Sequence, residues 1–169
     1  MKKLSLVLSL ILGFFLISCG SSSIDDLFPD LPPDPGEEGK KTLAGIDVDN
    51  DGVRDDVQRW IYERVPNEEN LRKSLLKYAE IKQLSLLNAE DKQKSLDLSL
   101  RRLRSLECSW WHSKQLGSEE SGMDLTSELA AQIVNTKQRV IAEVTADSHS
   151  SGRVVSLTPD EKRSQLCEF

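Results

Sequence analysis

Apolar residues recur three or four positions apart from Val57 to Val144, and this spacing restricts the fold more than any other feature. Such spacing places side chains on one face of an α-helix, whereas a half-buried strand needs strict alternation, which is convincing nowhere in the sequence. We therefore predict an all-α domain, a small helical bundle, over residues 55–169. The expected inner faces of its four longer helices are Val57, Trp60, Ile61 and Val65; Leu71, Leu75, Tyr78, Ala79 and Leu84; Leu96, Leu100, Leu103, Leu106 and Trp110; and Leu125, Leu129, Ile133, Val140, Ile141 and Val144.

Proline and capping residues set the expected ends of the first helices. Pro66 should end the first helix at Val65, and Asn67 can cap the second. Asn88 would begin the third helix. The second and third could instead form one long helix, because neither glycine nor proline separates them.

Later breaks are marked by glycine and proline. Gly117 and Gly122 interrupt the helical pattern before the fourth helix. Thr158 and Pro159 provide an N-cap and a first helical position for a last short helix, which should end near Cys167.

The amino-terminal residues have the order of an export signal. Lys2 and Lys3 give a positive start, an apolar run covers residues 4–17, and small residues follow. An uncleaved transmembrane helix is the weaker interpretation, because the run is shorter than the roughly 20 apolar residues that span a bilayer.

The end of this run, Leu16-Ile17-Ser18-Cys19, resembles the lipobox of bacterial lipoproteins. The resemblance implies that residues 1–18 are a signal peptide, removed before Cys19, and that the sulfur of Cys19 carries a diacylglyceryl group. The membrane would then be a partner through this lipid. The resemblance places the protein in the bacterial cell envelope, and Gly20 after the cysteine favours the outer membrane over the inner one.

Lipidation of Cys19 would leave two cysteines, Cys108 and Cys167. An even pair in an oxidising, exported setting predicts a disulfide bond. Closing so long a loop should stabilise the fold by about 4 kcal/mol.

Residues 19–42 carry no periodic apolar pattern and are rich in serine, proline, glycine and acidic residues. Such a segment buries too little apolar surface to offset its ordering entropy, so we expect a disordered tether. At about 3.1 Å per residue, an extended tether would hold the helical domain roughly 70 Å from the membrane.

Acidic residues outnumber basic ones by 28 to 22, a formal net charge of −6. Removing Lys2 and Lys3 with the signal peptide makes this −8 by the same count. Nucleic-acid binding needs a basic surface, so we expect no nucleic-acid partner. The acyl chains should also be the sole attachment to the membrane, since anionic lipids repel a negative domain.

Residues 47–56, DVDNDGVRDD, form the most chemically specific stretch. Aspartates at alternating positions bring their carboxylates to a common point if the backbone turns tightly at the sixth residue, which is Gly52. Carboxylate and carbonyl oxygens in a flexible site select Ca²⁺ over Mg²⁺ and over transition metals. The candidate ligands are Asp47, Asp49, Asp51, the main-chain carbonyl of Val53, Asp55 directly or through water, and Asp56 as a further carboxylate.

The segment from Asp47 to Gln58 resembles the DxDxDG calcium loops of EF-hands and, more closely, of thrombospondin type 3 repeats. It departs from the EF-hand because Gln58 stands at the twelfth position instead of glutamate, and Arg54 at the eighth instead of an apolar residue. There is no second loop to form an EF-hand pair. The resemblance implies one calcium-binding loop within residues 43–58, in which Asp56 could supply the missing carboxylate.

The same acidic stretch could instead form only a turn and a helix cap. Five carboxylates in ten residues repel one another without a cation, which favours the calcium site. The sequence therefore predicts a non-enzymatic, membrane-anchored binding or structural module with Ca²⁺ as its cofactor and an unidentified protein partner. The alternatives are a small exported enzyme and an inhibitor or immunity-type lipoprotein.

Overall fold

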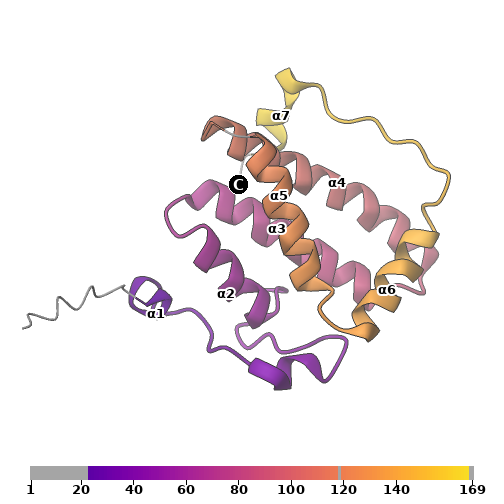
Figure 1. Ribbon diagram of the computed structural model, residues 1–169. Coiled ribbons are helices and arrows are strands. Elements are labelled where there is room, and N and C mark those ends of the chain that lie inside the picture. The colour runs from indigo at the N-terminus through magenta and orange to yellow at the C-terminus, as the bar shows by residue number, and fades with distance from the viewer. Residues whose placement is uncertain (1–22, 118, 168–169) are drawn as a thin grey trace, which may run out of the picture.

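Seven α-helices and one 3-10 helix make up the computed structural model, which describes residues 23–117 and 119–167 (Figure 1). These residues contain no β-strand, so the predicted all-α class is confirmed. None of the described helices is long and apolar enough to cross a membrane. In chain order the elements are α1 (Ile24–Leu27), η1 (Gly36–Lys40), α2 (Asp55–Arg64), α3 (Glu69–Leu87), α4 (Lys92–Gln115), α5 (Glu119–Ile133), α6 (Lys137–Ser148) and α7 (Asp160–Leu166).

Helices α3 and α4 are separate and pack against each other as the central pair of the bundle. Asn88 ends α3, and its side-chain amide donates to the carbonyl of Leu84 at 2.8 Å. Asp91 begins α4 by accepting from the N–H of Lys94 at 3.0 Å. The prediction that Asn88 starts the third helix is therefore wrong. Polar side chains that satisfy the helix ends make this turn without glycine or proline.

The single helix expected over residues 125–144 is two helices, α5 and α6. Thr136 caps α6 by accepting from the N–H of Arg139 at 3.3 Å. The break changes the direction of the chain, so three residues expected on the inner face are exposed instead. These are Val140, Ile141 and Val144.

The hydrophobic core lies where α2, α3 and α5 meet (Figure 1). Val57 and Ile61 of α2, Leu75 of α3, and Leu129 and Ile133 of α5 are almost fully buried, as the spacing predicted. Each such side chain contributes about 1.5–3 kcal/mol of hydrophobic free energy.

Small residues bring α4 and α5 close together. Ser109 and Ser113 of α4 are buried, and a Cβ added at Gly122 would stand 2.7 Å from the Cβ of Ser113. Gly122, expected to break the helix, therefore lies inside α5 at this close approach. Gly117, with φ of 103°, follows α4 as expected.

The segment predicted as a disordered tether is folded from Ser23 onward. Ser23 forms a capping box with Asp26 at the start of α1. The ring of Phe28 then packs edge-on against Tyr62 of α2, with centroids 4.7 Å apart. Arg59 of α2 donates to the carbonyl of Pro32 at 2.8 Å. Residues 23–42 thus lie against α2 and contribute to the walls of the site described below.

After α6 the chain follows the outside of the bundle to α7, which packs against α4 (Figure 1). Residues 151–157 of this connection are exposed. Helix α7 begins at Asp160, one residue after the predicted first position, Pro159. The Thr158 hydroxyl does not cap the helix, because it donates to Glu107 at 2.9 Å. It ends at Leu166, next to Cys167, as predicted.

Candidate metal centre

The acidic loop closes through its backbone just before α2. The N–H of Asp55 donates to the carbonyl of Ile46 at 2.9 Å. Asn50 and Gly52 have φ angles of 58° and 88°, the left-handed region that glycine adopts most readily. A side chain at Gly52 would also stand 3.1 Å from Glu80, so glycine at the sixth loop position makes the sharp turn that the sequence predicted.

Three carboxylates converge inside this loop. Asp47, Asp49 and Asp55 each offer an oxygen, and these oxygens lie within 4.8 Å of one another, close enough to hold a metal ion. Asp55 is fully buried. One of its oxygens accepts from the N–H of Val48 at 3.0 Å, and the other is buried without a hydrogen-bond partner. A buried carboxylate oxygen without a partner is costly, so the site favours a bound cation.

Gln58 connects two of the aspartates from the first turn of α2. Its amide nitrogen donates to Asp49 at 3.1 Å and to Asp51 at 3.0 Å. Asp51 also accepts from the N–H of Val53 at 2.7 Å. The side-chain oxygen of Gln58 is buried without a hydrogen-bond partner. Asp51 therefore borders the triad, and Gln58, at the twelfth position, lies next to it.

The electrostatics of the loop disfavour full ionisation of its carboxyl groups. Burial is the main cause that raises the pKa of Asp55 and of Asp51 above the usual value. The neighbouring charges of Asp49 and Asp47 raise both pKa values further. A cation among these groups would stabilise their charged forms.

Asp56 lies apart from the triad, which corrects its assignment as a further metal ligand. Its two oxygens accept from the Arg54 guanidinium at 2.9 and 3.0 Å, and one also accepts from Asn135 at 3.1 Å. Arg54 is almost fully buried and donates to the carbonyl of Ile133 at 2.9 Å. The arginine at the eighth loop position thus needs Asp56 as its counter-ion while it binds the end of α5.

A second buried arginine, Arg139 of α6, was missed from the sequence. It donates to the carbonyls of Gly39 at 2.6 Å, Thr42 at 3.0 Å and Leu43 at 3.3 Å. Burial, and then the charge of Arg54, lower its pKa to about 10. Nothing in the local sequence distinguishes Arg139 from surface arginines, because its three carbonyl partners lie 96 to 100 residues earlier in the chain.

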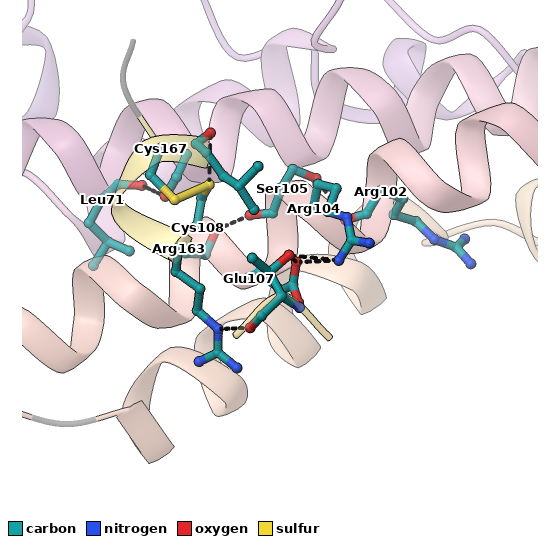
Figure 2. The surroundings of a disulfide bond; sticks show 12 residues. Leu71, Arg102, Arg104, Ser105, Glu107, Cys108, Arg163 and Cys167 are labelled. Atoms are coloured by element: carbon teal, nitrogen blue, oxygen red, sulfur yellow. Dashed lines mark hydrogen bonds and ion pairs between the residues drawn. A yellow bond between two sulfur atoms is a disulfide. The ribbon is translucent and has the colours of Figure 1, made fainter. Parts of the chain in front are cut away.

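The predicted disulfide joins Cys108 of α4 to Cys167, with Cα atoms 5.3 Å apart (Figure 2). Beside it, the fully buried Glu107 accepts from Arg104 at 2.8 Å and from the N–H and hydroxyl of Thr158. Burial alone would raise the pKa of Glu107, but these hydrogen bonds outweigh it and hold that pKa below 4.5. The carboxylate thus ties the segment before α7 to α4.

Cys19, the predicted site of lipidation, lies outside the described residues. The chain matches no protein-family model, no curated protein and no solved structure.

Proposed function

We propose that this protein is anchored in the bacterial cell envelope by lipid on Cys19, and that one structural Ca²⁺ orders its helical domain. The domain acts as a non-enzymatic binding or structural module. The observation that carries the calcium proposal is the partnerless, buried oxygen of Asp55 beside the carboxylates of Asp47 and Asp49. The anchor rests on the lipobox-like residues 16–19.

The donor set favours calcium over other cations. The triad offers oxygen atoms alone, whereas zinc and copper prefer imidazole or thiolate. Asp51 and the carbonyl of Val53 in the same loop, and the side-chain oxygen of Gln58 in the first turn of α2, are further oxygen donors. Ca²⁺ accepts six to eight such oxygens in flexible geometry, while Mg²⁺ requires a near-ideal octahedron. Without glutamate at the twelfth position, we expect a Kd of about 10⁻⁴–10⁻³ M, as in extracellular modules.

A cation here would stabilise more than the loop. The loop leads directly into Arg54, whose guanidinium holds the carbonyls of Gln132 and Ile133 at the end of α5. Fixing the acidic residues therefore fixes the start of α2 against α5. A ligand that binds only the native state at ten times its Kd adds about 1.4 kcal/mol of stability.

Thermal unfolding of the detergent-solubilised full chain tests the calcium proposal. The melting temperature is measured once with EDTA and once with millimolar CaCl₂. Wild type should melt at higher temperature with calcium. The isosteric double variant Asp47→Asn and Asp49→Asn should lose this response. In EDTA the variant should be at least as stable as wild type, because it lacks two of the mutually repelling charges.

The control variant Asp30→Asn with Glu90→Gln removes the same charge from exposed positions outside the loop and should respond to calcium as wild type does. If the loop variant and wild type respond alike, the acidic loop is only a turn and a helix cap.

A further inference from the structure

A cavity of about 450 Å³ opens between the amino-terminal segment, α2 and the end of α5. Its volume lies in the range of roughly 300–1,000 Å³ that is typical of small-molecule sites. The lining is largely polar, and Trp60 is its one aromatic residue among those described. The side chains that define its chemistry are Asp34, Arg59, Trp60, Glu63, Gln132 and Asn135.

The charges of the lining disfavour a strongly anionic ligand. Its two cations already have carboxylate partners: Lys40 pairs with Glu37 at 2.6 Å, and Arg59 pairs with Asp25 at 2.8 Å. Asp34 and Glu63 form no ion pair within the described residues. The excess charge is therefore negative, so a phosphate or carboxylate ligand would be repelled and a cationic group attracted.

The hydrogen-bonding groups around the cavity suit a ligand that both donates and accepts. Carboxylates only accept and guanidinium groups only donate, whereas the amides of Gln132 and Asn135 do both. No hydrogen bond within the described residues uses the Gln132 amide. Hydroxyl groups match such a mixed lining because each carries one donor and two acceptor sites. Trp60 packs partly against the hydrophobic core, and the part of its indole that lines the cavity supplies apolar surface, which a ligand of C–H and O–H groups can cover.

We propose that this cavity binds a neutral saccharide, with the C–H face of a sugar ring against Trp60 and its hydroxyl groups on Glu63, Arg59 and Gln132. The inference deepens the binding role proposed above and rests on it. It gives that role a ligand class, because neither an anion nor a purely apolar molecule fits the lining, while the amides and the indole offer a neutral ligand contacts that a cation would not use. A cationic ligand is the alternative that the tetralysine probe below tests.

The walls of the cavity are fixed before any ligand arrives. The Arg64 guanidinium lies 5.1 Å from the centroid of the Trp60 ring. Arg59 holds the amino-terminal segment through the carbonyl of Pro32. Asn135 donates to Asp56 at 3.1 Å and accepts from Arg139 at 2.6 Å. Such preorganisation lowers the entropy cost of binding.

Isothermal titration of the full chain in detergent with two neutral tetrasaccharides, maltotetraose and N,N′,N″,N‴-tetraacetylchitotetraose, tests the inference. At least one should bind saturably. The double variant Glu63→Gln and Gln132→Ala should lower its affinity roughly tenfold, since two hydrogen-bonding groups are altered. The Gln132→Ala substitution leaves the main-chain carbonyl at position 132 in place, so this carbonyl still accepts from Arg54. Trp60→Ala should abolish binding.

Gln93→Ala, at an exposed position on α4, is the matched control and should bind as wild type does. A tetralysine peptide is the counter-probe. The inference is overturned if neither sugar binds, if the peptide alone binds at the cavity, or if the double variant binds sugar unchanged. A calcium-dependent melt without sugar binding refutes this inference alone, whereas sugar binding without a calcium effect refutes only the metal site.

Discussion

Two buried guanidinium groups, on Arg54 and Arg139, hold separate parts of the chain together through main-chain carbonyls. Burying a charge costs free energy unless it is fully hydrogen-bonded. Arg54 has Asp56 as its counter-ion, whereas Arg139 binds three carbonyls of the amino-terminal segment and the amide of Asn135. Arg54 therefore holds the end of the acidic loop against α5, and Arg139 holds residues 39–43 against α6.

The Arg139→Met variant should lose about 3 kcal/mol of stability, because several buried carbonyls lose their donor. Hydrogen exchange should rise selectively in residues 36–43, and urea unfolding would measure the free energy. Arg153→Met removes an exposed guanidinium and should change stability by less than about 0.5 kcal/mol. Equal effects of the two variants would contradict the role given to Arg139.

Glu107 makes the free energy of unfolding depend on pH in the acid range. Its pKa in the folded protein lies below the ordinary value of 4.5, so the folded state binds fewer protons than the unfolded state in this window. Its stabilising contribution is therefore present above pH 4.5 and is lost as the pH falls through the folded pKa. Thermal melts between neutral and acid pH should show a smaller acid loss in Glu107→Gln, which starts less stable at neutral pH. If the melting temperatures of Glu107→Gln and of wild type fall in parallel as the pH is lowered, this contribution is excluded.

At the scale of elements, the connection between α6 and α7 differs from the rest of the bundle. Residues 151–157 are exposed, and Val154 is 97% exposed, whereas both neighbouring helices are attached to the bundle. Few contacts protect this backbone, so it should open locally at little cost.

Limited trypsin digestion should therefore cut first after Arg153. The carboxy-terminal piece should remain attached through the bond between Cys108 and Cys167, and should separate only after reduction. Gel electrophoresis with and without dithiothreitol would show this. Arg153→Gln should delay the first cut, and an early cut within α3 or α4 would contradict the expected order.

At the scale of the molecule, docking of the amino-terminal segment changes the distance between the domain and its proposed anchor. If Cys19 carries lipid, only three residues lie between it and Ser23. The four Cα–Cα steps from Cys19 to Ser23 then span at most roughly 14 Å. The folded domain would then lie near the membrane surface rather than at the end of a long tether.

Cys19→Ser should leave the protein unprocessed or soluble, because stable anchoring needs the acyl chains. Membrane fractionation and mass analysis of the amino terminus would measure this. Ser21→Ala should fractionate and mature as wild type does. Wild-type processing and fractionation of Cys19→Ser would exclude the lipoprotein assignment.

The sequence by itself determined the helical class, the buried faces of α2 and α3, the cysteine pair and the acidic turn at Gly52. These features follow from local spacing or from the counting of residues, which need no knowledge of distant partners. The tertiary structure decided the partners of Arg54, Asp56 and Arg139, and the folding of residues 23–42. These depend on carbonyls up to a hundred residues away in the chain, and neither periodicity nor composition records which distant groups a buried charge will meet.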